Sequence, residues 1–175
     1  MKNLINTKLI GKKILLRVDL NVPVVEGIIT DKSRIAAIRL TVKKLQEQKN
    51  KVFLISHYGR PNGEIKKEYS LEFICETLKK ELELKKIFFL KNLTEEEIKK
   101  TLNVMNYSDV CLIENIRFYP EEEKGDFDFA KRISKNFDIF VNDAFSVSHR
   151  RHASIVGFPK FLPSYAGYGL LEEIE

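Results

Sequence analysis

The sequence alternates short apolar runs with longer amphipathic segments, and this alternation constrains the fold more than any other feature. Each run is followed by polar, Gly or Pro residues and then by apolar side chains at helical spacing. This repeat is typical of β–α units, so we predict an α/β domain with a mostly parallel sheet covered by helices on both faces. The predicted strands are Lys13 to Val18, Lys51 to Ser56, Ile87 to Leu90, Val110 to Ile113 and Ile139 to Asn142. The predicted helices are Lys32 to Gln48, Ser70 to Glu83, Thr94 to Leu102 and Asp126 to Asn136.

Length and composition fit one soluble domain. The chain has 175 residues, of which 43% are hydrophobic and 31% charged, which is ordinary for a globular protein. A net charge of +5, with Lys and Glu mixed along most of the length, does not by itself indicate nucleic acid, and an anionic small molecule fits equally well. Since no apolar stretch reaches the roughly 18 residues of a membrane span, and the first residues lack a signal-peptide pattern, we expect a cytoplasmic protein without a membrane partner.

The two cysteines are expected to serve as apolar packing residues. Cys75 lies in a helical pattern and Cys111 in an apolar run, and neither has the spacing of a metal or disulfide motif. We therefore predict neither a disulfide nor a metal pair.

Two helix boundaries carry local signals. Thr94 followed by Glu97 fits a capping box, because the N3 carboxylate can return to the amide of the cap residue. The C-terminal segment PSYAGYGLLEEIE is predicted as a helix opened by Pro163 and Ser164. It ends in acidic residues that oppose the helix dipole and has no stop signal. We therefore expect that the given sequence ends within a longer helix, with a frayed native tail as the alternative.

The ends of the predicted strands carry the candidate functional residues. In an open parallel sheet, ligands bind beyond the carboxyl ends of the strands, where loops and helix N-termini converge. After the first strand, in RVDLNVP, a period of two places Arg17, Asp19 and Asn21 on one face and Val18, Leu20 and Val22 on the other. The other strand ends supply His57 and Arg60, then Glu114, Asn115 and Arg117, and finally Asn142, Asp143, His149, Arg150, Arg151 and His152.

Each candidate also has a structural explanation. Arg17 and Asp19 could form an ion pair, Glu114 and Asp143 could brace loops, and Arg151 could be solvated. However, Arg and His residues follow several of the strands. Because like charges repel, such a cluster indicates that the residues share a bound anion. Guanidinium groups bind phosphate and carboxylate through paired donors, so the predicted ligand carries one or both groups.

Five segments of the chain resemble successive motifs of one family. They are RVDLNVP, ITDKSRI, SHYGRPNG, ENIRFYPEEEKGD and NDAFSVSHRRHASIVG, and they occur in the order and at the spacing of the amino-terminal domain of phosphoglycerate kinases. The resemblance covers essentially the whole chain. It implies a Rossmann-like three-layer domain that binds 3-phosphoglycerate or 1,3-bisphosphoglycerate and packs against a carboxyl-terminal domain, which binds Mg²⁺ with ADP or ATP and is absent from this sequence.

The resemblance also implies roles for individual residues. Arg34 would lie nearest the transferred phosphoryl group and is the expected catalytic residue. Asp19 and Asn21 would orient the hydroxyl and carboxyl end of the substrate. The implied substrate-binding set is Arg17, Asp19, Asn21, Arg34, His57, Arg60, Arg117 and Arg150, without a metal or nucleotide site in this chain. A monomer that acts as the glycerate-binding half of a glycolytic kinase, inactive by itself, is expected.

Some positions depart from the family pattern. Ala36 and Leu40 replace the usual Arg and Pro, so we expect the helix there to start or pack differently. Ser146 and Val147 replace Gly and Thr, which argues against a close approach of that backbone to the ligand. Tyr58 and Tyr119 replace the commoner Leu and His.

Two other functions are weighed against this one. A stand-alone anion-binding or nucleic-acid-binding module could use the same basic face, but no aromatic residues are interleaved with the basic ones in an RNA-binding pattern. A dinucleotide-binding domain is disfavoured because RVDLNVP stands where G-x-G-x-x-G would follow the first strand. We therefore expect no nucleic-acid partner.

Overall fold

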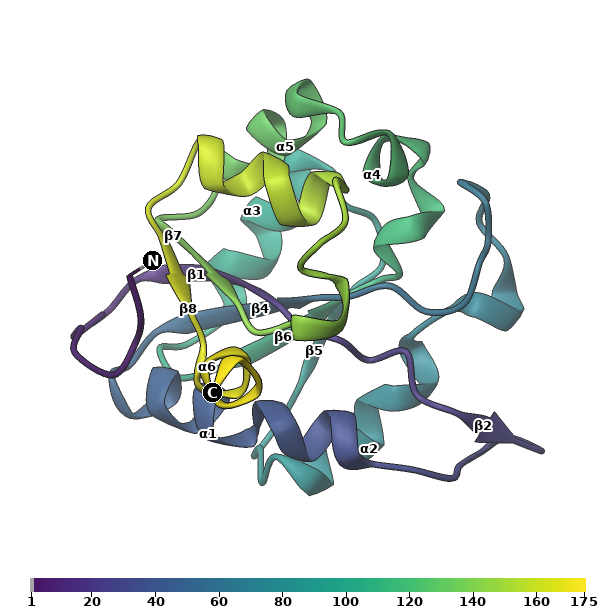
Figure 1. The fold of residues 1–175 in the computed structure, drawn as a ribbon, viewed down its shortest axis with the longest axis horizontal. Coiled ribbons are helices and arrows are strands. Elements are labelled where there is room, and N and C mark those ends of the chain that lie inside the picture. The colour runs from purple at the N-terminus through teal and green to yellow at the C-terminus, as the bar shows by residue number, and fades with distance from the viewer. Residues whose placement is uncertain (1) are drawn as a thin grey trace.

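Six strands form one sheet in which every neighbouring pair is parallel (Figure 1). The structure, a computed structural model, describes residues 2–175. Across the sheet the order is β5-β6-β4-β1-β7-β8. These strands span Phe88–Leu90, Val110–Ile113, Lys51–Ile55, Lys13–Arg17, Ile139–Asn142 and Ser164–Ala166, respectively.

The central strand β1 is buried on both faces. It pairs with β4 on one side and β7 on the other, so that Leu15 lies opposite Phe53 and Phe140. Leu15 packs into the core on one face of the sheet, whereas Leu16 packs into the core on the other. A strand covered on both faces has no solvent-facing positions, which explains why this segment reads as a continuous apolar run.

Helices cover both faces of the sheet, which confirms the predicted Rossmann-like three-layer α/β fold (Figure 1). On one face lie α1 (Ser33–Glu47), α2 (Cys75–Glu81) and the C-terminal α6 (Tyr168–Ile174). On the other lie α3 (Glu95–Val104), α5 (Phe127–Ser134) and a π-helical turn at Ala153–Gly157. A short helix, α4 (Pro120–Lys124), follows the end of β6.

The five predicted strands are all present and match within one residue at each end. The sequence did not predict the antiparallel hairpin of β2 (Val24–Val25) and β3 (Ile28–Ile29), the edge strand β8 or the helix α4. The prediction that Pro163 and Ser164 open the last helix is wrong. Ser164 instead begins β8, which pairs with β7, and the helix starts only after the extended residue Gly167.

The predicted burial holds for Cys111, whereas Cys75 is only half-buried, and both are free thiols. Burial raises the pKa of Cys75 to about 11, so that thiol stays protonated at neutral pH. Within residues 2–175, none of the helices combines the length and apolar character needed to cross a bilayer.

Thr94 caps α3 as predicted, although within residues 2–175 the Glu97 carboxylate makes no hydrogen bond back to the Thr94 amide. The cap provides a test of local stability. The Thr94 hydroxyl oxygen accepts from the Glu97 amide at 3.2 Å. Replacing Thr94 with Ala should lower the free energy of unfolding by about 1 kcal/mol, because one amide of the first turn loses its acceptor. Thr94→Ser, which keeps the acceptor, is the control in urea denaturation. Equal stability of Thr94→Ala and the wild type would contradict the assignment.

Candidate anion-binding site

The sheet topology brings four loops to one edge of the molecule. The chain leaves β1 towards β4 on one side and returns to β7 on the other, so the strand order reverses at β1. Such a reversal opens a crevice beyond the carboxyl ends of the strands. The loops after β1, β4, β6 and β7 all end at this crevice, and they carry the candidates that the sequence singled out.

A hollow of about 510 Å³ lies among these loops, and we call it the basic hollow. It collects side chains from all four loops, including three arginines. Its lining residues are Asn21, His57, Gly59, Arg60, Asn62, Arg117, Glu123 and Arg150. Five of the eight residues predicted from the sequence therefore meet around one cavity. Glu123 supplies the one carboxylate of that lining, so positive charge prevails.

Arg117 is the most enclosed arginine of the basic hollow. Arg117 is 7% exposed, and one terminal nitrogen of its guanidinium group donates to the Gly59 carbonyl at 3.0 Å. Its Nε atom is buried and has no hydrogen-bond partner among residues 2–175. Burial lowers the pKa of Arg117, while Glu123 opposes that shift. A buried donor without a partner is costly, so this guanidinium is suited to an incoming anion.

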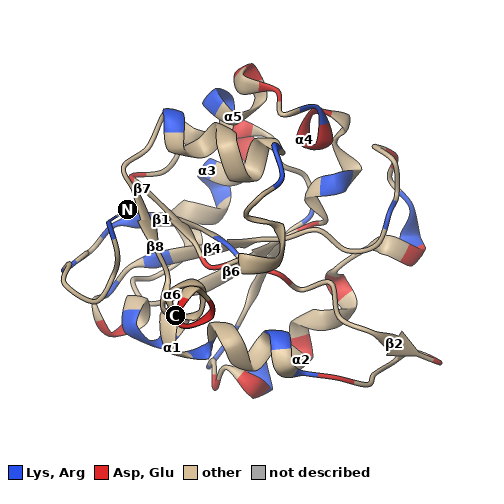
Figure 2. Ribbon diagram, viewed as in Figure 1, with Lys and Arg blue, Asp and Glu red and all other residues tan. Residues whose placement is uncertain are grey.

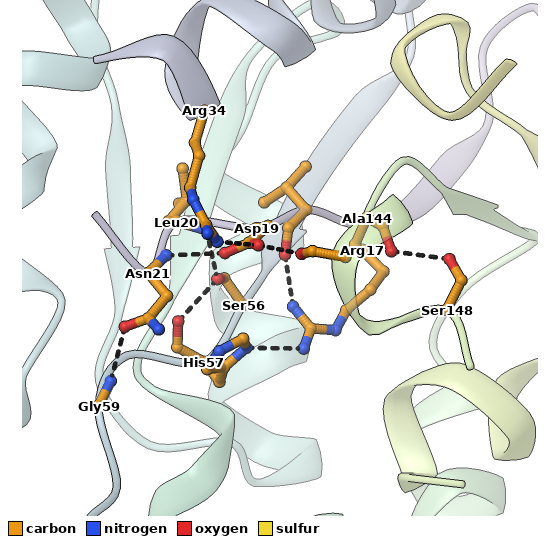
Figure 3. Close-up of polar contacts among 12 residues, drawn as sticks. Arg17, Asp19, Leu20, Asn21, Arg34, Ser56, His57, Gly59, Ala144 and Ser148 are labelled. Carbon is orange, nitrogen blue, oxygen red and sulfur yellow. Dashed lines mark hydrogen bonds and ion pairs between the residues drawn. The ribbon is translucent and has the colours of Figure 1, made fainter. Parts of the chain in front are cut away.

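Gly59 shapes the loop that carries His57 and Arg60. Its φ is +63°, a conformation that other residues rarely adopt, and a Cβ there would lie 2.4 Å from the Tyr69 ring. Its amide donates to Asn21 Oδ1 at 2.9 Å, which ties the loops after β1 and β4 together (Figure 3). The glycine of SHYGRPNG is therefore required by local geometry.

Arg34 lies in a second, smaller hollow of about 220 Å³. It extends from the first turn of α1 and pairs with Asp19 (Figure 3). The Oδ2 atom of Asp19 also accepts from the Ser146 hydroxyl. Burial would raise the pKa of Asp19, but the hydrogen bonds from Ser146 and the Asn21 amide, with Arg34, outweigh it and the pKa is lowered. Asp19 is therefore ionised at neutral pH and holds Arg34 at the edge of the crevice.

Arg17 lines neither hollow. It is fully buried, and its guanidinium donates to Ser154 Oγ at 2.9 Å and to the Val18 carbonyl. The predicted alternation does not carry Arg17, Asp19 and Asn21 to one face, because β1 ends at Arg17 and the three side chains reach different surroundings. The alternative of an Arg17–Asp19 ion pair is also wrong, since Asp19 pairs with Arg34.

His57 connects Arg17 to the basic hollow. Its Nδ1 atom lies 3.1 Å from an Arg17 terminal nitrogen (Figure 3). Burial, together with the charges of Arg17 and Arg117, lowers the pKa of His57 to about 2. His57 is therefore neutral at physiological pH and can donate or accept a hydrogen bond, but it adds no charge to the hollow.

Several candidates brace loops. Glu114 accepts from the Ser70 hydroxyl at 2.6 Å and from the Leu71 amide at 2.8 Å, and Asp143 accepts from the Leu170 amide at 2.8 Å. The bracing roles considered for Glu114 and Asp143 are thus confirmed. Arg151 is exposed, as its solvated alternative required.

The positions that depart from the family pattern have local contacts. Ala36 and Leu40 are both exposed on α1, which begins at Ser33. Val147 is buried, and Ser146 contacts Asp19. In addition, the Tyr58 ring packs against Phe73, and the Tyr119 hydroxyl accepts from the Leu93 amide at 2.9 Å.

Glu122 and Ser154 were not singled out from the sequence. Both are fully buried, and Glu122 accepts from the Ser154 hydroxyl and from its amide at 2.7 Å. Glu122 lies inside the acidic run of α4, which appears red in Figure 2. The run resembles a solvated face, and nothing in its pattern marks the middle carboxylate as buried.

Fold and site together define a Rossmann-like α/β domain with a cation-lined hollow at its strand ends. A family model described as phosphoglycerate kinase matches residues 4–175. The chain therefore belongs to the phosphoglycerate kinase family.

Individual relatives agree with this assignment. A phosphoglycerate kinase from Coprothermobacter proteolyticus is 47% identical over 94% of this chain and 42% of its own length, and one from Wolbachia pipientis wMel is 44% identical over 97% and 42%. The crystal structure of phosphoglycerate kinase from Pyrococcus horikoshii OT3 has a TM-score of 0.88 at 28% identity, covering 99% of this chain and 44% of that one. The structure of phosphoglycerate kinase from Coxiella burnetii has a TM-score of 0.85 at 35% identity, covering 97% and 42%. The chain thus spans less than half the length of these relatives.

Proposed function

We propose that this chain is the glycerate-binding amino-terminal domain of a phosphoglycerate kinase, which transfers a phosphoryl group between 1,3-bisphosphoglycerate and ADP to give 3-phosphoglycerate and ATP. One observation carries the proposal. Arg60, Arg117, Arg150 and the neutral His57 converge on a single hollow at the strand ends. Three guanidinium groups around one cavity repel each other unless an anion occupies it, and a phosphate monoester fits their paired donors.

The smaller hollow suits the reacting end of the substrate. In the direction that consumes ATP, the nucleophile is the carboxylate of 3-phosphoglycerate, which is ionised at neutral pH, so no general base is needed. Phosphoryl transfer depends mainly on alignment and on positive charge near the moving group. Arg34 provides that charge in our proposal, and Asp19 holds Arg34 in position before the substrate arrives. Asp19 and Asn21 then orient the hydroxyl and carboxyl end.

Mg²⁺ and the nucleotide are assigned to the carboxyl-terminal domain of the family. Within residues 2–175, the acidic, His and Cys side chains form no group of three that could hold a metal ion. In our proposal, the roles of the residues of this chain are binding and orientation alone. A monomer that packs against its own second domain completes the proposal.

The proposal predicts selective binding of a phosphorylated glycerate. A thermal-shift panel should compare 3-phosphoglycerate, glycerate, NAD and single-stranded RNA at equal ionic strength. We expect 3-phosphoglycerate to raise the melting temperature, because it alone places a phosphate in the basic hollow and a carboxylate near Arg34. The effect should shrink as salt is added, since several clustered cations bind the ligand.

Two outcomes would contradict this function. Equal shifts with glycerate and 3-phosphoglycerate would mean that the basic hollow does not bind the phosphate. A shift with RNA and none with 3-phosphoglycerate would favour the alternative of a nucleic-acid-binding module on the same scaffold.

A further inference from the structure

A continuous chain of buried polar groups runs from α4 to the basic hollow. Glu122 accepts from the Ser154 hydroxyl, and Ser154 Oγ accepts from Arg17 Nε at 2.9 Å. Arg17 then contacts His57 Nδ1 at 3.1 Å, and His57 lines the hollow. Glu122, Ser154 and Arg17 are fully buried, and His57 is 4% exposed. The four residues come from four separate segments, so the network joins elements that are distant in the sequence.

The direction of each hydrogen bond in this network is fixed by chemistry. A guanidinium group can only donate, so Arg17 must donate to Ser154 Oγ and to His57 Nδ1. The Ser154 hydroxyl has one hydrogen, which it gives to Glu122. Since Nδ1 accepts, a neutral His57 carries its hydrogen on Nε2. The imidazole therefore has its Nε2–H group available to donate a second hydrogen bond.

Glu122 also compensates the charge of Arg17. A fully buried guanidinium is expensive unless a carboxylate lies nearby, and Glu122 is joined to it through a single hydroxyl group. Burial lowers the pKa of Arg17, and Glu122 is the largest influence that opposes this shift. The carboxylate therefore helps to keep Arg17 a cation that can donate to His57.

We propose that Glu122 and Ser154 are positioning residues, which act through Arg17 to hold His57 as the Nε2–H tautomer facing the basic hollow. The identity of the anion that accepts from Nε2–H rests on the function proposed above, whereas the tautomer does not. The neutral donor would complement the three arginines, because it adds a directed hydrogen bond without further charge repulsion.

The test is a two-bond ¹H–¹⁵N correlation spectrum of the His57 ring in the ligand-free chain at neutral pH. In the wild type, Nδ1 should resonate as an unprotonated nitrogen and Nε2 as a protonated one. In Ser154→Ala, Arg17 Nε loses its acceptor, so the two nitrogen shifts should move towards each other as the second tautomer appears. Ser134→Ala is the matched control, because Ser134 is a buried serine whose hydroxyl has no partner among residues 2–175.

Glu122→Gln provides a second variant in case Ser154→Ala does not fold. The amide keeps the shape of the side chain but replaces one acceptor oxygen by a donor, so it cannot accept both bonds from Ser154. The same convergence of the ring shifts is expected. In either variant, 3-phosphoglycerate should bind more weakly by calorimetry, by up to about 10- to 150-fold, the range for complete loss of one hydrogen bond to a charged group.

The outcomes separate this inference from the proposed function. A wild-type tautomer pattern in the folded variants, or an equal change in Ser134→Ala, would overturn the positioning role. If the ring shifts change as expected but wild-type protein does not bind 3-phosphoglycerate, the proposed ligand is wrong and the positioning of His57 stands.

Discussion

Replacing Arg117 with Ala is expected to weaken 3-phosphoglycerate binding about 10- to 150-fold, which corresponds to the roughly 1.5–3 kcal/mol of a charge-assisted hydrogen bond. Arg117 is the appropriate target because its guanidinium is mostly enclosed, its Nε has no partner among residues 2–175, and it lines the basic hollow. Water screens such a contact less than one at the surface. Titration calorimetry measures the loss directly.

Arg117→Ala also removes the hydrogen bond to the Gly59 carbonyl, so it could reshape the loop that carries His57. Arg60→Ala separates the two effects, because Arg60 is exposed and lines the same hollow. We expect a loss in the same range from Arg60→Ala. Arg151→Ala removes the same charge from an exposed neighbour of Arg150 outside both hollows and should leave the affinity close to that of the wild type.

Unchanged affinity in both Arg60→Ala and Arg117→Ala would exclude the basic hollow as the phosphate site. An equal loss in Arg151→Ala would show that overall positive charge, rather than the geometry of the hollow, drives binding. Circular dichroism and urea midpoints of each variant show whether the domain remains folded, so a loss of affinity can be assigned to the site.

The sequence predicted the strands that are buried on both faces of the sheet. The strands β1, β4, β6 and β7 are covered on both faces, so their residues form apolar runs whose ends can be located within one residue. The edge strand β8 was missed because Ser164–Ala166 has neither length nor an apolar run, and it exists through its pairing with Phe140–Asn142. Pairing with a partner distant in sequence leaves no local signal, and here tertiary context decides the structure.

The candidate site was predictable to a similar extent. Cations at the ends of parallel strands lie at one edge of the sheet, so the sequence alone was enough to group Arg60, Arg117 and Arg150. The burial of each arginine could not be predicted, because the sequence pattern does not indicate that Arg17 is enclosed while Arg34 is partly exposed. Ser154 and Glu122 were also missed, because a buried polar residue is explained by its partners rather than by its neighbours in sequence.

The two hollows suggest a division of labour along the substrate. One side of the basic hollow is fixed by hydrogen bonds, because the Gly59 amide bonds Asn21 and the Glu122–Ser154–Arg17 network ends at His57. Arg34, by contrast, extends from α1 with a side chain that is 42% exposed, and within residues 2–175 its ion pair is with Asp19. Firm binding of the distant phosphate would therefore leave Arg34 able to change partner when a phosphoryl group approaches, at the cost of its pairing with Asp19.

The isolated chain of 175 residues is expected to bind 3-phosphoglycerate without phosphorylating it. Folding does not depend on a second domain in our proposal, because the six-stranded sheet has a core on each face. The residues proposed to bind the substrate all lie between Arg17 and Arg150. Turnover needs more, since phosphoryl transfer requires the nucleotide phosphates to be held in line with the acceptor and shielded from water. The sequence has no phosphate-cradling Gly/Lys loop for that purpose.

A coupled assay of ATP consumption with 3-phosphoglycerate and Mg²⁺ tests this expectation on highly purified chain. Arg34→Ala, prepared identically, is the control, because a trace of contaminating kinase would give the same rate in both preparations. We expect no turnover above that shared background, even at substrate concentrations that saturate binding in calorimetry. Sustained turnover that disappears in Arg34→Ala would show that the chain is a complete kinase. The nucleotide would then have to bind within residues 2–175, opposite Arg34, and the assignment of that role to a second domain would be wrong.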